Sequence, residues 1–215
     1  MKPKLLLIGA GGHCKVILDL LLKTKKYKIS GIIDLKERVG ESIFGIKIIG
    51  TDSLLSSFFK KGIRSCFISM GSIGDPGLRV KLFNNAKKIG FIFPNLISPN
   101  ALISPKVVLG EGNYIAPGAI INADTRIGDN CIINTGAIVD HDCKIGNFVH
   151  LAPGSVLNGG VCVGNYSHIG AGSTVIQNIK IGEKTIVGAA SLVIKNISNN
   201  KVAYGSPCRE RKNNV

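Results

Sequence analysis

The sequence predicts a small α/β domain over residues 1–94 and a parallel β-helix over residues 95–215. The β-helix is indicated by a period of six, because every sixth residue from Ile97 to Val193 is aliphatic, at seventeen of seventeen positions. The α/β domain is indicated by short apolar runs that alternate with amphipathic stretches before residue 95. A period of six fits neither an α-helix nor an ordinary strand. It fits a chain in which each face takes one hexapeptide and three hexapeptides complete a coil.

Two other positions of the hexapeptide agree with this interpretation. The residue two before each aliphatic one is mostly small, as at Ala119, Cys131 and Ser155, and is expected to point inward. Gly often follows the aliphatic residue, as at Gly110 and Gly128, where it is expected to take the corner without steric cost. Coils stacked at ~4.8 Å would make a prism of a little over five coils, about 25 Å tall.

The α/β domain is expected to begin with a strand at 4–8, a glycine turn and a helix through residues 16–22. Further elements are expected to alternate along the chain, with strands at 28–33, 45–49 and 65–70 and helices at 52–60 and 75–88. The last helix has end signals, with Asp75 as N-cap, Pro76 in the first turn and Gly90 after its end. This alternation predicts a small parallel sheet with crossover helices, a Rossmann-like unit.

Composition narrows the class of protein. Lys and Arg number 27 against 13 Asp and Glu, a formal charge of +14, but no aromatic-interleaved basic patch of the kind that binds RNA or single strands is present. The charge is therefore interpreted as a solvated surface that also suits ligands with phosphates, and no nucleic acid partner is expected. Six cysteines without paired spacing predict neither a disulfide framework nor a zinc module. No apolar run approaches the ~20 residues of a membrane span, so a cytoplasmic protein without stable membrane insertion is expected.

The first expected strand ends in a glycine-rich turn, Gly-Ala-Gly-Gly-His, at residues 9–13. Backbone N–H groups at a helix N-terminus bind phosphate, and Gly allows close approach, so Gly11, Gly12 and His13 are candidate ligand contacts. Cys14 stands where the dinucleotide fingerprint requires Gly or Ala. The turn therefore indicates a mononucleotide or sugar-nucleotide site, with a purely structural glycine turn as the alternative.

Two residues at the ends of later strands belong to the same edge of the expected sheet. Asp34 closes the second strand, where an acidic residue can bind a ribose or a base. Gly71 follows the strand at 65–70. Because open α/β sheets bind ligands at the carboxyl ends of their strands, both residues are candidate substrate contacts.

Three histidines lie in the repeat. His141 stands between Asp140 and Asp142 at an outward position, where an imidazole beside carboxylates suits a general base, with a surface histidine among acids as the alternative. His150 and His168 are 18 residues apart and are expected to stack on one face, one coil apart. Zinc-binding β-helices of the carbonic anhydrase type use a close His pair, which the spacings of 9 and 18 do not provide, so no metal is expected.

These motifs together resemble one family of bacterial sugar acetyltransferases, which join a small Rossmann-like domain to a left-handed parallel β-helix. The resemblance rests on the hexapeptide repeat, the turn at 9–13, the run Asp-His-Asp-Cys-Lys-Ile-Gly at 140–146, His150, and the ending Gly-Ser-Pro-Cys-Arg at 205–209. Bacillosamine N-acetyltransferases and sialic-acid O-acetyltransferases belong to this family. The resemblance implies a homotrimer with acetyl-CoA in the groove between two β-helices.

The resemblance also implies roles for individual residues. His141 would be the general base and Asp142 its orienting carboxylate, at a place where the family often carries the longer Glu. Asn134 would lie beside the base, His150 would contact acetyl-CoA, and the Gly159 amide would face the thioester oxygen. The other implied contacts are to the pantetheine arm, by Ala171 and Ala189, and to the nucleotide of the sugar, by Gly11, Gly12, His13 and Asp34. The family assigns no role to His168.

The implied function is acetyl-CoA-dependent N-acetylation of a nucleotide-linked 4-amino-4,6-dideoxy sugar, for surface glycan or glycoprotein biosynthesis. O-acetylation of sialic acid or a related sugar rests on the same motifs and is the first alternative. A non-catalytic trimeric scaffold is the second alternative. Neither the nucleotide nor the stereochemistry of the sugar is determined by the sequence.

Overall fold

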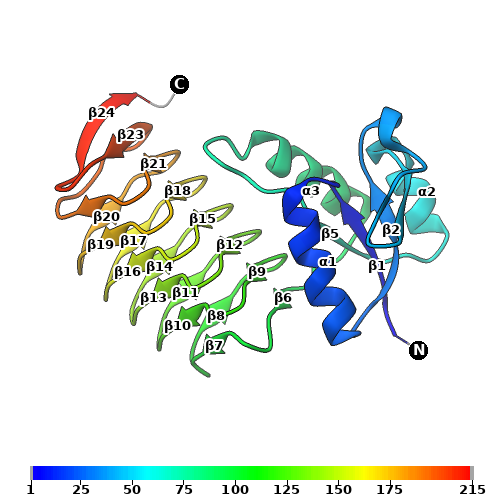
Figure 1. The fold of residues 1–215 in the computed structure, drawn as a ribbon, viewed down its shortest axis with the longest axis horizontal. Coiled ribbons are helices and arrows are strands. Elements are labelled where there is room, and N and C mark those ends of the chain that lie inside the picture. The colour runs from blue at the N-terminus through cyan, green and yellow to red at the C-terminus, as the bar shows by residue number, and fades with distance from the viewer. Residues whose placement is uncertain (1, 214–215) are drawn as a thin grey trace. The chain divides into compact units, whose positions relative to one another are not determined.

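The computed structural model describes residues 2–213, with the backbone alone at Lys212 (Figure 1). The chain divides into two compact units. The first runs to Ser72 and includes Gly77–Pro94, and the second comprises Ile73–Pro76 and the chain from Asn95 onward. No helix within the described range is both long enough and apolar enough to cross a membrane.

The first unit is an α/β domain whose five-stranded sheet has the order β3-β4-β2-β1-β5. Its strands are β1 (Lys4–Ile8), β2 (Lys28–Ile33), β3 (Ser42–Ile43), β4 (Ile46–Gly50) and β5 (Ser65–Ile68). Its helices are α1 (Gly12–Thr24), α2 (Leu55–Lys60) and α3 (Gly77–Ile89), with short 3₁₀ turns η1 (Lys36–Arg38) and η2 (Asp52–Leu54). Strands β4, β2, β1 and β5 run parallel, which confirms the expected Rossmann-like sheet.

The structure adds a hairpin that the sequence did not reveal. Strand β3 pairs antiparallel with β4, and the two are joined by the two-residue loop Phe44-Gly45. A strand of two residues is too short to show the alternation of apolar and polar side chains that identifies strands in a sequence. Helix α3 begins at Gly77, slightly later than the expected start near Asp75, a shift within the usual uncertainty of helix ends.

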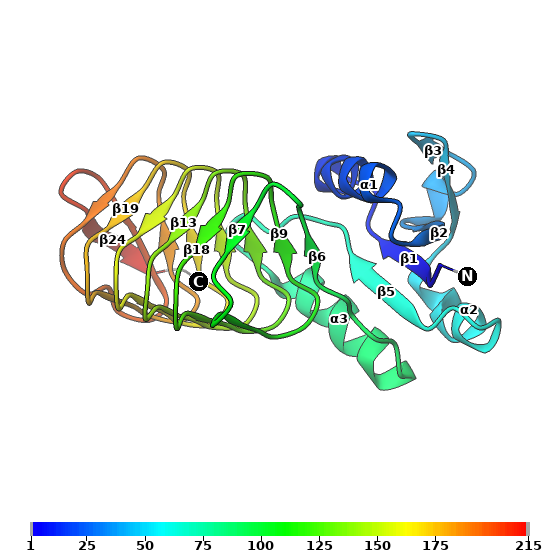
Figure 2. The same ribbon diagram turned by 90° about the horizontal axis from the view of Figure 1, so that it is seen from below.

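The second unit is a parallel β-helix of three sheets, and Figure 2 shows its coils stacked one on another. The β13 face contains β7 (Leu102–Ile103), β10 (Ile120–Ile121), β13 (Ile138–Val139), β16 (Val156–Leu157), β19 (Thr174–Val175) and β22 (Leu192–Val193). The β14 face contains β8 (Val108–Leu109), β11 (Arg126–Ile127), β14 (Lys144–Ile145), β17 (Cys162–Val163) and β20 (Lys180–Ile181). The β15 face contains β6 (Leu96–Ile97), β9 (Tyr114–Ile115), β12 (Ile132–Ile133), β15 (His150–Leu151), β18 (His168–Ile169), β21 (Ile186–Val187), β23 (Lys201–Tyr204) and β24 (Arg209–Asn213).

Successive coils keep a register of 18 residues, as in the pairing of Ile121 with Val139. The aliphatic residue of each hexapeptide fills the interior, and Val139 and Leu157 have no exposed surface. The small residues two places earlier also point inward, with Cys131 and Ser155 fully buried. Both expectations are confirmed. Each coil adds one layer of aliphatic and small side chains to the interior, and close packing leaves no room for larger residues at the small positions.

The corners of the β-helix contain left-handed backbone at one place in every hexapeptide. Positive φ recurs at each sixth residue from 112 to 190: Gly112, Gly118, Asp124, Asn130, Gly136, Asp142, Phe148, Gly154, Gly160, Tyr166, Gly172, Asn178, Lys184 and Ala190. The glycines that follow the aliphatic residues are elsewhere in the hexapeptide. A Cβ on Gly110 would lie 2.2 Å from Asp129 Oδ1, and one on Gly128 would lie 2.3 Å from Asn147 Oδ1. The close approach of the next coil therefore requires these glycines, so a residue without a Cβ is needed here as expected, although the left-handed backbone lies at another position of the hexapeptide.

Candidate active site

His141 lies at the corner between β13 and β14, and its side chain is 61% exposed. Its Nδ1–H donates a hydrogen bond of 2.7 Å to Asp142 Oδ2, so this carboxylate reaches the ring although it is shorter than Glu. Its backbone N–H donates one of 2.8 Å to Asp140 Oδ1. The hydrogen bond to Asp142 and the charge of Asp140 raise the pKa of His141 above its usual value. With the proton held on Nδ1, Nε2 is the basic atom of the neutral ring.

The imidazole of His141 lies over Gly159, which occupies the same corner one coil later. A Cβ added to Gly159 would lie 2.7 Å from both Cε1 and Nε2 of His141. The Gly160 N–H donates a hydrogen bond of 2.9 Å to the His141 carbonyl, which holds the two corners in register. Gly159 therefore makes room for the ring, a role that sequence reasoning missed when it considered only the Gly159 amide.

Gly159→Ala is expected to displace the His141 ring and break its hydrogen bond to Asp142. The pKa of His141 should then fall toward its ordinary value, which a histidine NMR titration measures. Because the ring is exposed, the melting temperature should change by less than about 2 °C. The matched control is Gln177→Ala, at the same corner one coil further along. An unchanged pKa in Gly159→Ala would contradict this account of the corner.

His150 and His168 stack on the β15 face, as the period of 18 predicts. They are register partners in β15 and β18, with ring centroids 4.8 Å apart at an angle of 66°. Asn134 Nδ2 lies 3.2 Å from His150 Nε2 and donates to it, so this amide is placed beside His150. His150 is nearly buried, and burial lowers the pKa of His168. Within residues 2–213, no group of three or more His, Cys, Asp or Glu side chains is arranged to hold a metal ion.

One copy of the chain brings the expected β-helix residues together in two separate groups. The first group, at the corner between the β13 and β14 faces, is His141, Asp142 and Gly159. The second group, on the β15 face and at its corner with the β13 face, is Asn134, His150, Ala171 and Ala189. The β13 face, one hexapeptide wide, separates the two corners of the three-sided coil. A single β-helix therefore does not assemble both groups into one site.

The turn after β1 is built by Gly9 and Asp34. Gly9 has a φ of +101°, and a Cβ there would lie 2.9 Å from Met70 Cβ, so Gly is required. Asp34 Oδ2 accepts a hydrogen bond from the Ala10 N–H. Asp34 Oδ1 accepts one of 2.7 Å from the Leu35 N–H. Asp34 thus secures the glycine turn to the end of β2, in addition to the ligand contact proposed for it from the sequence.

Arg38 is a member of this site that the sequence did not reveal. Its Nη1 donates a hydrogen bond of 3.0 Å to the Ala10 carbonyl and lies 3.5 Å from Asp34 Oδ2. Its Nε and Nη2 donate bonds of 3.1 and 3.0 Å to Glu41 Oε2. The only signal in the sequence is the spacing of four residues between Asp34 and Arg38, which is common between surface charges. Folding places this cation beside the glycine turn.

The other expected contacts gather at the same edge of the sheet. Gly11 and Gly12 stand at the start of α1, and a Cβ on either would meet no heavy atom of the described residues within 4 Å, beyond its chain neighbours and its own helix. Gly11 has a φ of −78°, which any residue adopts. A Cβ on Gly71 would lie 3.7 Å from His13 Cβ, so these two positions are neighbours. Packing thus requires Gly at position 9 but not at positions 11 and 12, which favours close approach of a ligand over the purely structural interpretation.

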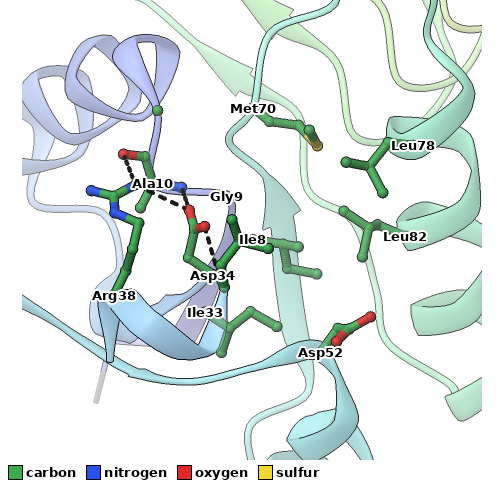
Figure 3. Close-up of a pocket in the computed structure, with 12 residues that line it drawn as sticks. Ile8, Gly9, Ala10, Ile33, Asp34, Arg38, Asp52, Met70, Leu78 and Leu82 are labelled. Carbon is green, nitrogen blue, oxygen red and sulfur yellow. Dashed lines mark hydrogen bonds and ion pairs between the residues drawn. The ribbon is translucent and has the colours of Figure 1, made fainter. Parts of the chain in front are cut away.

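Two hollows meet at Ala10, Gly11 and Arg38. The first, drawn in Figure 3, has a volume of about 360 Å³, apolar walls and the carboxylates of Asp34 and Asp52. Its apolar walls come from Ile8, Ile33, Leu35, Met70, Leu78 and Leu82. The second has a volume of about 600 Å³ and is also lined by Gly12, Lys15, Ser42, Ile43 and Phe44. Apolar walls next to two cations and the amides of a helix N-terminus suit an elongated ligand that carries phosphates.

Comparison with known proteins covers both units. The PglD N-terminal domain model matches residues 4–86, and the bacterial transferase hexapeptide model (six repeats) matches residues 124–159. The chain is similar to PerB from Caulobacter crescentus, solved in complex with CoA and GDP-perosamine, with 39% identity, a TM-score of 0.90 and 97% of each chain covered. It is also similar to the acetyltransferase domain of PglB from Neisseria gonorrhoeae FA1090, solved with acetyl coenzyme A, with 32% identity, a TM-score of 0.88, and 98% of this chain and 100% of that chain covered.

A third likeness covers half of the chain. It is 35% identical over 108 residues to the uncharacterized protein L142 of Acanthamoeba polyphaga mimivirus, which covers 50% of this chain. The chain spans only 20% of the length of that curated relative. This likeness carries no functional information.

The relatives that match over nearly their whole length define the class of protein. The chain belongs to the family of sugar acetyltransferases that combine a PglD-type N-terminal domain with a hexapeptide-repeat β-helix. The family expected from the sequence motifs is thereby confirmed. So is the predicted fold class, a Rossmann-like α/β domain followed by a left-handed parallel β-helix.

Proposed function

We propose that this chain transfers the acetyl group of acetyl-CoA to the amino group of a nucleotide-linked 4-amino-4,6-dideoxy sugar. The observation that carries the proposal is the exposed His141–Asp142 pair, which holds a basic Nε2 at the surface of a β-helix. Support comes from PerB, whose structure contains both CoA and GDP-perosamine, and from the PglB domain, whose structure contains acetyl coenzyme A. Such a product would serve surface glycan or glycoprotein biosynthesis in the cytoplasm.

The proposed chemistry begins at the amine. An ammonium has no lone pair, so the sugar amine attacks the thioester carbon only when it is neutral or loses its proton in the step. His141 Nε2 accepts that proton, while Asp142 keeps the other proton on Nδ1 and stabilises the imidazolium that forms. A general base of this kind contributes about 10²–10⁴-fold to a rate.

The other contributions to the rate act on the thioester of acetyl-CoA. We propose that the Gly159 N–H donates to the oxyanion that develops on the thioester carbonyl, a contribution of roughly 3 kcal/mol for one well-placed donor. The bond between carbonyl carbon and sulfur then breaks, and coenzyme A leaves as a thiolate that needs little help from an acid. Holding both reactants in one orientation supplies much of the rest of the acceleration. His150, Ala171 and Ala189 are the proposed contacts of coenzyme A.

The nucleotide of the acceptor is proposed to bind at the α/β unit, in the two hollows beside the glycine turn. Gly11, Gly12 and His13 would receive phosphate oxygens at the N-terminus of α1, where backbone N–H groups and the helix dipole favour an anion. Asp34 and Gly71 would complete the site at the carboxyl edge of the sheet. Lys15 lines the same hollow and would complement the negative charge of the phosphates, and Arg38, which is paired with Asp34 and Glu41, lines it as well.

We further propose that the active form is a homotrimer. His141 lies at one corner of the β-helix and His150 lies on the face beyond the next corner, so a complete site needs a second copy of the chain. In a cyclic trimer the corner of each copy meets the β15 face of its neighbour, which forms three equivalent sites. The groove between the two copies would then hold acetyl-CoA.

The proposal is tested by thiol release from acetyl-CoA with three acceptors. These are a UDP-linked 4-amino-4,6-dideoxy sugar, its GDP-linked counterpart and free sialic acid. Release is expected with at least one of the two amino sugars, and its product should be an amide that survives mild alkali. Release with sialic acid alone, giving an alkali-sensitive ester, would replace N-transfer by O-transfer. No release with any of the three would favour the scaffold.

A further inference from the structure

Phe44 occupies an unfavourable position at the tip of the β3–β4 hairpin. The loop has two residues, and φ is +48° at Phe44 and +77° at Gly45. Positive φ at both central residues defines a type I′ turn, in which Asn-Gly, Asp-Gly and Gly-Gly are strongly preferred. A bulky side chain in this backbone region is an outlier, and such outliers cluster at functional sites.

Packing does not account for the phenylalanine either. Phe44 is 58% exposed, so most of its ring lies in solvent. The same residue lines the hollow of about 600 Å³ that contains Gly11, Gly12, Lys15 and Arg38. An exposed aromatic ring is thus held at the rim of a cavity with two cations and the N-terminus of α1.

We propose that Phe44 is a nucleotide-binding residue whose ring stacks on the base of the sugar nucleotide. The inference rests on the proposed function, which supplies the ligand class. Phosphates bound at Gly11, Gly12 and Lys15 place the ribose beside the end of β2, where an acidic residue of a Rossmann-like sheet binds it. Arg38 connects that end of β2 to the hollow that Phe44 lines. The base, which is flat and aromatic, then lies against the hairpin tip.

Recognition of a base by stacking differs from recognition by hydrogen bonds, because stacking does not depend on which base is bound. Every base presents an aromatic face, so a stacking residue contributes to binding of purine and pyrimidine nucleotides alike. Loss of the ring is expected to weaken binding of both GDP and UDP by about tenfold. Choice between the two nucleotides would remain with other residues of the hollows.

The test compares Phe44→Asn, Phe44→Trp and the wild-type chain by calorimetric titration with GDP and with UDP. Phe44→Asn restores the preferred Asn-Gly turn, so it should raise the melting temperature, by about 4 °C, while it weakens binding about tenfold. Phe44→Trp keeps a stacking surface and should bind at least as tightly as wild type. The control is Ile92→Asn, which removes a side chain of similar exposure (61%) that lines neither hollow.

Phe44→Asn is expected to raise the melting temperature and to lower the affinity for nucleotide. Because these changes have opposite signs, they separate a binding role of the ring from a structural one. Unchanged affinity in Phe44→Asn, when the wild-type chain binds either nucleotide, would reject this inference and leave the proposed function intact. Weaker binding that is accompanied by a lower melting temperature would also reject it, because the ring would then serve the fold. A wild-type chain that binds neither nucleotide would reject the inference together with the nucleotide-linked acceptor.

Discussion

Replacement of His141 by Asn is expected to lower the turnover number for acetyl transfer by about 10²–10⁴-fold. Asn has a similar size and still forms hydrogen bonds, but it does not accept a proton from an amine. Because the ring is exposed, the melting temperature and the binding of CoA should stay close to wild type. Thiol release at saturating concentrations of both substrates measures the effect.

A second variant, Asp142→Asn, tests whether His141 is the group whose loss of a proton controls the pH dependence of the rate. Its carboxylate is the main cause of the raised pKa of His141, so its removal lowers that pKa. A general base acts in its neutral form, and the rate therefore rises with pH as His141 loses its proton. The rising limb of the pH–rate profile should move to lower pH in Asp142→Asn, at a reduced maximal rate. A limb that stays in place, or full turnover in His141→Asn, would remove His141 as the base.

Two inactive variants are expected to regain about a quarter of the wild-type activity when equal amounts are reassembled into mixed trimers. His141→Asn damages the corner between the β13 and β14 faces, and His150→Ala damages the β15 face. A shared site is intact when one variant supplies the corner and the other supplies the face. Random assembly produces that combination with a probability of one half times one half, about a quarter. Thiol release before and after co-assembly measures the recovery.

The control for this experiment pairs two variants with damage at the same corner. His141→Asn and Gly159→Ala both damage the copy that supplies the corner, so their mixture should show no more activity than the two variants measured separately. If the His141→Asn and His150→Ala pair also failed to recover, each site would have to lie within one copy. A monomer in light scattering would lead to the same conclusion.

The β-helix was predictable in detail because its contacts repeat. Residues that touch between coils are 18 positions apart, so tertiary neighbours can be read from the sequence without knowledge of the fold. This offset predicts that His150 lies beside His168, and the two are register partners in the structure. It also placed the aliphatic residues inside and His141 outside. The reason for the glycines that follow the aliphatic residues was missed because it depends on how closely the next coil approaches, as at Gly110 and Gly128.

The α/β unit has no such offset, and its site was only partly predictable. The glycine turn and Asp34 were identified because each stands at the end of an apolar strand. Arg38 was missed because its contact with the Ala10 carbonyl joins residues 28 positions apart through an irregular segment. Phe44 was missed because its hairpin is too short to leave a pattern, and its unfavourable φ is visible only in the folded backbone.

The sequence by itself determined the coil, its inward and outward positions, the family and the candidate base, because all of these follow from local patterns or a fixed repeat. Only the tertiary structure decided that His141 and His150 belong to separate groups of one copy. The reason is that their separation depends on how the three sheets of the β-helix are arranged around its axis. The tertiary structure also decided that Arg38 and Phe44 lie beside the glycine turn. Their neighbours come from segments without a repeating pattern, so no fixed spacing in the sequence predicts these contacts.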